Sequence, residues 1–207
     1  MNAPLVAAAC LAFATLASHA GIESLFDGHS FKGWDGDTNK TWRIEYGALV
    51  GGSLTDTVPR NEFLATTERY TNFVLRLKVR LLGTEGFVNS GIQIRSERVP
   101  NHHEMIGYQA DVGKGWWGAL YDESRRNKIL AKPEEGVAER AVKEGEWNHY
   151  EMRAEGRRVV LTINGVQTID YTEPDESLAQ FGRIGLQIHG GGKGLVAFKD
   201  INLERLP

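Results

Sequence analysis

The sequence predicts an all-β protein, built as an antiparallel β-sandwich or jelly roll. Apolar and polar residues alternate with period two along much of the chain, no segment keeps helical spacing for a dozen residues, and many of the 24 glycines lie between apolar runs. In NFVLRLKVRLL, residues 72–82, the apolar side chains share one face, while Arg76, Lys78 and Arg80 share the other. This pattern is typical of an antiparallel strand that is buried on one side.

Short strands of the same kind are expected along the rest of the chain. They are predicted at residues 42–50, 62–66, 90–96, 106–111, 118–122, 147–155, 157–171, 182–190 and 195–206. Asn164-Gly165, inside 157–171, is the dipeptide that two-residue hairpin turns favour. Residues 127–148 are expected to form a long loop with one helical turn, because prolines and glycines interrupt any longer helix.

The first twenty residues, MNAPLVAAACLAFATLASHA, contain no charged side chain and end in an A-x-A-like pattern at Ala20. We interpret residues 1–20 as a secretory signal peptide and residues 21–207 as a single domain. The alternative, a membrane anchor, is disfavoured because the apolar run is too short to span a bilayer comfortably. The mature protein is therefore expected to be periplasmic or secreted and not inserted in a membrane.

The charge and the cysteine content exclude several classes of function. The chain has 24 Lys and Arg against 27 Asp and Glu, a net charge of -3, and it has no basic block, so no nucleic-acid partner is expected. Its single cysteine, Cys10, lies in the predicted signal peptide, which excludes thiol catalysis and cysteine-ligated metals in the mature chain. The sequence leaves the oligomeric state open.

Polar residues recur with the same parity on three predicted strands and indicate a carbohydrate site. They are Gln93 and Arg95, then Gln109 and Asp111, then Gln187 and His189. If the three strands are neighbours, these side chains form a floor of hydrogen-bonding groups suited to sugar hydroxyls, and Trp116, Trp117 or Tyr121 supply a flat wall for a pyranose ring. The alternative is an ordinary solvated face of an antiparallel sheet.

Other motifs are weaker. HHE at 102–104 lacks a third ligand at zinc spacing, and DGDTN at 35–39 lacks the glycine and glutamate of a calcium loop. HGGGKG at 189–194 does not open a helix, and no paired-carboxylate motif of sandwich-fold glucanases is present. No cofactor is expected, and the sequence leaves open whether a divalent cation assists.

An ordered series of segments resembles the 3-keto-disaccharide hydrolase domain family. The segments are LFDGHSFKGW (25–34), NSGIQIRS (89–96), GYQAD (107–111), GALYDESRR (118–126), EWNHYEMRAEG with LTINGV (146–166), GRIGLQIHGG (182–191) and VAFKDINLERL (196–206). The resemblance implies a concanavalin-like sandwich, in an exported protein, that acts on sugars oxidised to a ketone at C3. In such sugars a base removes the acidified C2 proton and the group on C1 leaves by elimination.

The resemblance also implies a set of site residues. The polar face comprises Asn89, Gln93, Arg95, Gln109, Asp111, Gln187 and His189. The family pattern places a glutamate two residues before Gln109, where this chain has Gly107. Either Glu123, Asp111 or His189 supplies the base instead, or the protein binds its sugar without turning it over.

Two main hypotheses follow. In the first, the protein cleaves 3-keto-glycosides: Arg95 and nearby amides stabilise the C3 oxyanion, and His189 or Asp111 removes the C2 proton. Glu123 protonates the leaving oxygen, Trp116, Trp117 and Tyr121 seat the ring, and Asn89, Gln93, Gln109 and Gln187 bind substrate. In the second hypothesis the protein is a carbohydrate-binding module without chemistry. A third, weaker one is an interaction domain in a cell-envelope assembly.

Overall fold

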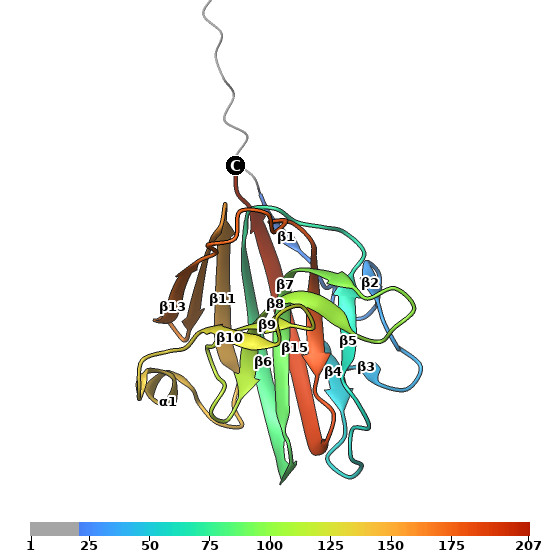
Figure 1. Cartoon of the computed structure of the whole chain (residues 1–207). Coiled ribbons are helices and arrows are strands. Elements are labelled where there is room, and N and C mark those ends of the chain that lie inside the picture. Colours follow the sequence, from blue (N-terminus) through green and yellow to red (C-terminus); the bar gives the residue numbers. More distant parts are fainter. Residues whose placement is uncertain (1–20) are drawn as a thin grey trace, which may run out of the picture.

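The computed structural model describes residues 21–207, which form two antiparallel sheets packed face to face (Figure 1). The predicted β-sandwich is confirmed. One sheet has eight strands, in the order β13-β12-β11-β6-β15-β4-β3 with β1 paired to β15, and the other has seven, in the order β10-β9-β8-β7-β14-β5-β2. The predicted signal peptide, residues 1–20, lies outside the described residues.

The elements of the eight-stranded sheet are β1 (Ile22–Ser24), β3 (Trp42–Glu45), β4 (Ala48–Gly52), β6 (Phe73–Gly86), β11 (Asn148–Glu155), β12 (Arg158–Ile163), β13 (Val166–Thr172) and β15 (Gly192–Arg205). Those of the seven-stranded sheet are β2 (Trp34–Asp35), β5 (Glu62–Thr66), β7 (Asn89–Arg98), β8 (Met105–Gly113), β9 (Leu120–Glu123), β10 (Lys128–Ala131) and β14 (Arg183–Ile188). The one helix of the described residues, α1 (Val137–Ala141), lies beside the β13 end of the sandwich in Figure 1. Within residues 21–207, no helix is long and apolar enough to cross a membrane.

The hydrophobic core fills the space between the two sheets. Its largest fully buried side chains include Trp42, Tyr108, Tyr150, Phe73 and Phe198. In β6 the buried residues alternate with Arg76, Lys78 and Arg80, as the sequence pattern predicts. Burying one large apolar side chain stabilises the fold by roughly 1.5–3 kcal/mol, so the alternation fixes which face of each strand turns inward.

Two hairpins show where local sequence decided the fold. Asn164 and Gly165 both have positive φ, of 49° and 83°, and join β12 to β13, as the dipeptide predicts. Tyr46 and Gly47, with φ of 50° and 71°, likewise join β3 to β4. The prediction of a single strand over 42–50 is therefore wrong, because tyrosine at a positive-φ turn position gives no strong local signal.

Residues 127–148 contain the short helix that was expected and also a strand, β10, that was not. The short edge strands β1, β2 and β10 were all missed. Each has four residues or fewer. Alternation cannot be recognised over so few positions, and these strands exist because a neighbouring strand offers free backbone groups.

An ionic network lies between the sheets, on the inner side of β9. The fully buried Asp122 accepts hydrogen bonds from Arg125 and Arg126, and Arg126 also donates to Glu173 Oε2 over 2.7 Å. The Tyr108 hydroxyl donates to the same Glu173 oxygen over 2.8 Å. This network ties the turn after β9 to the strand β8 and to the loop after β13.

Replacing Asp122 with alanine should lower the free energy of unfolding by about 3–5 kcal/mol, because two arginines lose their buried partner. Urea unfolding monitored by tryptophan fluorescence measures the change. Asp170→Ala is the matched control: its pair with Arg158 is largely exposed, and its loss should cost less than about 1 kcal/mol. An equal decrease in the free energy of unfolding of the two variants would contradict a structural function for the buried network.

Candidate active site

The strand register places the predicted polar residues next to one another on the outer face of the seven-stranded sheet. Gln93 pairs with Gln109, and Gly91 pairs with Asp111 on one side and Gln187 on the other. The prediction that these three strands are neighbours is confirmed. The side chains are not solvated, however: Gln93 and Gln187 are 0% exposed and Asp111 is 2% exposed. The outer face of this sheet is therefore not an ordinary solvated face at these residues.

A chain of hydrogen bonds orients the Asp111 carboxyl. The Ser96 hydroxyl donates to Gln93 Oε1 over 2.6 Å, and Gln93 Nε2 donates to Gln109 Oε1 over 2.7 Å. Gln109 Nε2 then donates to Asp111 Oδ1 over 2.8 Å. Each amide is held in one orientation, because only its nitrogen can donate and only its oxygen can accept. Among residues 21–207, Asp111 Oδ2 has no hydrogen-bond partner.

Gly91 makes room for this arrangement. A Cβ at position 91 would overlap the Gln109 amide, which lies across the glycine backbone. Any side chain at this position would displace the group that holds Asp111 Oδ1. The glycine is therefore part of the site, although it contributes no functional group of its own.

Burial shifts the acid-base behaviour of Asp111. Removal from water raises its pKa to about 8; the hydrogen bond from Gln109 opposes the rise, and the nearby Glu123 carboxyl adds to it. Asp111 is therefore protonated at neutral pH. Because Oδ1 already accepts from Gln109, the proton belongs on Oδ2, the oxygen without a partner among the described residues.

Glu123 lies on β9 directly opposite Gly107 of β8. The strand pairing thus brings a carboxylate beside the position where the family pattern has a glutamate and this chain has glycine. Gln187 Nε2 donates to Glu123 Oε2 over 3.3 Å. Burial and then the charge of Glu104 raise the pKa of Glu123 to about 7.

His189 follows the end of β14 and faces the same cleft. Its Nδ1 lies 2.6 Å from the Gly190 carbonyl oxygen, which can only accept, so Nδ1 carries the proton. Nε2 is then the ring nitrogen with the lone pair, and within residues 21–207 it accepts no hydrogen bond. The Phe87 ring packs edge-to-face on the imidazole with centroids 4.6 Å apart and limits its rotation.

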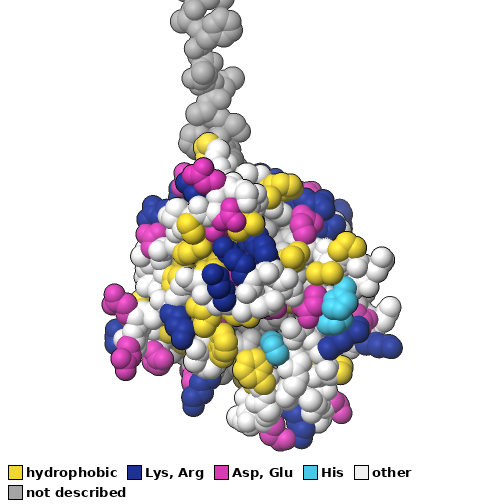
Figure 2. All heavy atoms as spheres, in the orientation of Figure 1, with side chains coloured by type: hydrophobic (Ala, Val, Ile, Leu, Met, Phe, Trp, Pro, Cys, Tyr) yellow, Lys and Arg dark blue, Asp and Glu magenta, His cyan; other side chains and the backbone are white. Residues whose placement is uncertain are grey.

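These groups line a cleft of about 120 Å³. Its lining residues are Phe87, Asn89, Gln109, Asp111, Trp116, Tyr121, Glu123 and His189. Trp116 packs edge-on against both Phe87 and Tyr121, with centroids 6.4 and 6.3 Å apart, so three aromatic rings border the polar groups. The view of Figure 2 shows hydrophobic, acidic and histidine side chains interspersed on this side of the molecule, with a group of basic side chains near its centre.

Arg95 is not in this cleft. It has φ of 50° at an irregularity in the pairing of β7 with β8, which ends the simple alternation that predicted it on the polar face. Its guanidinium donates to the Thr71 and Gly156 carbonyls and to the side chains of Asn72 and Gln180. With its donors engaged there, Arg95 is not placed to stabilise an oxyanion beside Asp111.

The other predicted residues divide into three groups. Asn89, Trp116 and Tyr121 line the cleft, whereas Gln93 and Gln187 are buried and act through Gln109 and Glu123. Trp117 lines a neighbouring cavity instead. Phe87 was missed, because a single aromatic residue after a glycine carries no sequence signal that links it to a histidine a hundred residues away.

Across residues 21–207, no group of three or more His, Cys, Asp or Glu side chains is arranged to hold a metal ion. His102 and His103 stack on each other with ring centroids 4.2 Å apart, in the loop between β7 and β8. They lie outside the cleft.

The model of the 3-keto-alpha-glucoside-1,2-lyase-like domain family matches residues 21–204. The chain belongs to this family. The match spans almost the whole described chain and confirms the resemblance carried by the sequence segments. No curated protein matches the chain.

Solved structures share the fold at low identity. A candidate glycosyl hydrolase from Parabacteroides distasonis is 20% identical, with a TM-score of 0.67 over 90% of this chain and 94% of that one. The carbohydrate-binding module CBM66 from Bacillus subtilis is 16% identical, with a TM-score of 0.62 over 83% and 95%. A B. subtilis protein with a galectin-like fold is 10% identical, with a TM-score of 0.62 over 84% and 90%. These likenesses establish the sandwich, and catalysts and binding modules both occur among its neighbours.

The raised pKa of Asp111 has a measurable consequence for stability. Since its pKa rises from 3.8 to about 8 on folding, the folded state keeps a proton that the unfolded state releases. Wild type should therefore lose stability relative to Asp111→Asn as pH rises through this range, by up to about 1.4 kcal/mol per pH unit. Urea unfolding of both proteins from pH 4 to 8 tests this, and a difference that stays constant with pH would contradict it.

Replacing Arg95 with methionine should cost roughly 1–3 kcal/mol of unfolding free energy, since the buried guanidinium donates to four acceptors on exposed or half-buried residues and these bonds are lost. Any glycoside-cleaving activity of the folded variant should stay within about twofold of the wild-type activity, because Arg95 does not reach the cleft. Arg153→Met, which removes an exposed pair with Glu155, is the control for stability. If the folded Arg95→Met protein had lost most of the glycoside-cleaving activity of wild type, Arg95 would have to act in the substrate site, which would contradict this prediction.

Proposed function

We propose that this protein is an exported enzyme that cleaves 3-keto-glycosides by removing the C2 proton and expelling the group on C1. The observation that carries the proposal is that one small cleft holds three groups suited to acid-base chemistry. They are the free Nε2 of His189, the protonated carboxyl of Asp111, and Glu123 with a pKa of about 7. Membership in the 3-keto-alpha-glucoside-1,2-lyase-like family supports the choice of substrate.

In the first step His189 Nε2 takes the proton from C2. The electron pair left on C2 forms a double bond to C3, and the C3 carbonyl oxygen becomes an oxyanion. Asp111 Oδ2 is suited to donate a hydrogen bond to this oxygen, because a neutral carboxyl buried away from water stabilises developing negative charge without carrying a charge itself. Asp111 thereby takes the function that the sequence suggested for Arg95.

In the second step the C3 carbonyl re-forms and the electron pair moves between C1 and C2. The bond from C1 to the glycosidic oxygen breaks, and Glu123 gives its proton to that oxygen as it leaves. The products are an alcohol and an unsaturated 3-keto sugar. Addition of water to C1 converts the latter to the free 3-keto sugar and completes a net hydrolysis.

The aromatic rings complete this assignment. Trp116, Tyr121 and Phe87 border the polar groups and offer flat faces to a pyranose ring, while Asn89 and Gln109 remain for its hydroxyls. Two-carboxylate hydrolysis needs an acid and a second ionised carboxylate across the glycosidic bond. Here both carboxyl pKa values are raised, which favours the elimination route.

The base assignment is tested with a 3-keto-disaccharide as substrate and release of free sugar as the readout. His189→Ala should lower kcat by about 10²–10⁴-fold, the usual range for loss of a general base. His102→Ala, which removes an exposed histidine outside the cleft, should leave kcat unchanged. Unchanged turnover in His189→Ala would rule out the imidazole as the base.

The acid assignment has a separate signature. Glu123→Gln should slow the disaccharide strongly but affect a 3-keto-glycoside with a 4-nitrophenolate leaving group much less, since a good leaving group needs no proton. For wild type, the rate with the disaccharide should fall above pH of about 7, where Glu123 loses its proton. Equal loss with both substrates would contradict this function of Glu123.

A second candidate function is carbohydrate binding without chemistry, which the structural likeness to CBM66 and the aromatic border favour. Binding of the 3-keto-disaccharide and of its unoxidised parent with similar affinity, and no release of free sugar from either, is the outcome that this candidate predicts.

A further inference from the structure

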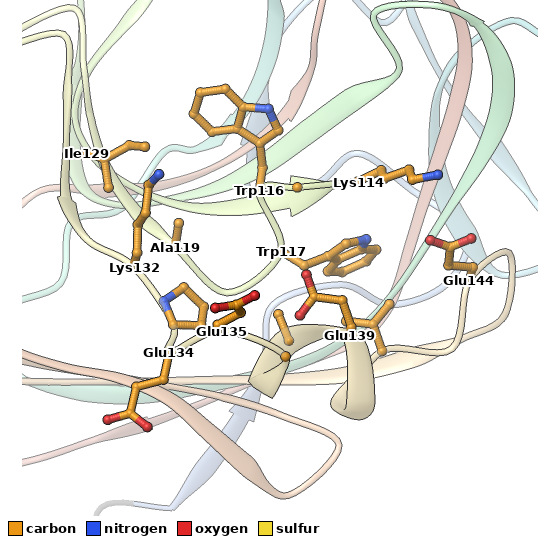
Figure 3. A pocket seen from close by; sticks show the side chains of 15 residues that line it. Lys114, Trp116, Trp117, Ala119, Ile129, Lys132, Glu134, Glu135, Glu139 and Glu144 are labelled. Atoms are coloured by element: carbon orange, nitrogen blue, oxygen red, sulfur yellow. The ribbon is translucent and has the colours of Figure 1, made fainter.

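A second cavity, of about 400 Å³, adjoins the cleft on the side of β9 and β10 (Figure 3). Trp116 lines both spaces, so the two share part of their walls. In Figure 3, Trp116 and Trp117 point in different directions from adjacent positions, and Trp117 faces the cavity that α1 borders. Apart from Trp116, no residue that lines this cavity takes part in the proposed catalytic steps.

The register of the sheet connects the two spaces. Gln109 pairs with Tyr121, and Tyr121 pairs with Ile129 of β10, so the three side chains follow one another across the outer face. Neighbouring strands lie about 4.8 Å apart, which places Ile129 roughly 10 Å from Gln109 across the sheet. From β8 to β10, the outer face therefore carries first a polar side chain, then an aromatic ring and then an apolar side chain.

The proposed acid lies on the same side. Glu123 and Tyr121 are two residues apart on β9 and both line the cleft, whereas His189 comes from β14 on the other side of β7 and β8. If Glu123 protonates the leaving oxygen, the group attached to that oxygen extends from β9 toward β10. The second cavity is located in this direction.

The lining of the cavity indicates what it holds. Its half-buried or buried walls are apolar, and its charged side chains are all exposed. The walls include Trp117, Ala119, Ile129, Pro133, Ala138 and Val142, and the exposed charges are Lys114, Lys132, Glu134, Glu135, Glu139 and Glu144. A second sugar ring needs several hydrogen-bonding partners around its edge, whereas a flat apolar group needs only walls of this kind. Four carboxylates against two lysines disfavour a negatively charged ligand.

The geometry points to this cavity as the binding site for an uncharged aromatic aglycone, the group that leaves from C1. The inference rests on the proposed function and adds the substrate class: glycosides of phenol-like alcohols. Trp117 and Ile129 contact the aglycone, and Trp116, which lines both spaces, borders the point where the aglycone joins the sugar ring.

The test compares phenyl and methyl 3-keto-α-glucosides in wild type and in Ala138→Phe, which fills the cavity from α1. The ratio of kcat/KM for the phenyl to the methyl substrate should fall at least fivefold in the variant, and kcat/KM for the methyl substrate should stay within twofold. Comparing ratios between the two proteins removes the intrinsic difference between the leaving groups. Ala179→Phe, an exposed position outside both spaces, is the matched control and should leave the ratio unchanged.

A binding experiment separates failure of this inference from failure of the proposed chemistry. Unoxidised phenyl α-glucoside should change the tryptophan fluorescence of wild type and of Ala179→Phe with saturation, and the change should be lost in Ala138→Phe. That result supports the aglycone site even if neither keto substrate is cleaved. An unchanged phenyl-to-methyl ratio in a folded Ala138→Phe protein, or absence of a saturable fluorescence change in wild type, overturns it.

Discussion

The site depends on one buried constraint, the chain of hydrogen bonds from Ser96 through Gln93 and Gln109 to Asp111. Each link fixes the orientation of the next amide, and the last link occupies one oxygen of a carboxyl that is almost completely removed from water. Burial keeps that carboxyl neutral at neutral pH, and the hydrogen bond decides which oxygen carries the proton. A group that would be an anion in water becomes a hydrogen-bond donor in the lining of the cleft.

The chain of amides requires space that only glycine provides. At Gly91 the Gln109 amide lies where a Cβ would be, and at Gly107, with φ of 142°, a Cβ would overlap the Ser96 hydroxyl. The second glycine also lies beside Glu123. A position that looks like the loss of a carboxylate in the sequence is therefore, in space, a position where the adjacent strand supplies one.

The same sandwich serves binding modules and catalysts, so the fold does not separate the two functions. The pKa values and hydrogen bonds of the polar groups favour the catalytic function over binding alone. A surface that only binds neutral sugars has no need for two carboxyls with raised pKa values near an imidazole whose Nε2 is free. Burying these groups costs stability, and a cost of this kind is expected where chemistry depends on it.

The sequence by itself determined the β-sandwich, most of its strands, the hairpin at Asn164-Gly165, and the shared face of Gln93, Gln109, Asp111 and Gln187, because alternation with period two is a local property of the chain. Tertiary structure decided the rest. The irregularity at Arg95 turned that side chain out of the alternation, the three short edge strands formed only against their neighbours, and Phe87 came to lie on His189. The pKa values of Asp111 and Glu123 also depend on burial by distant segments. No local pattern encodes such effects, because they arise from which strands pair and what covers them.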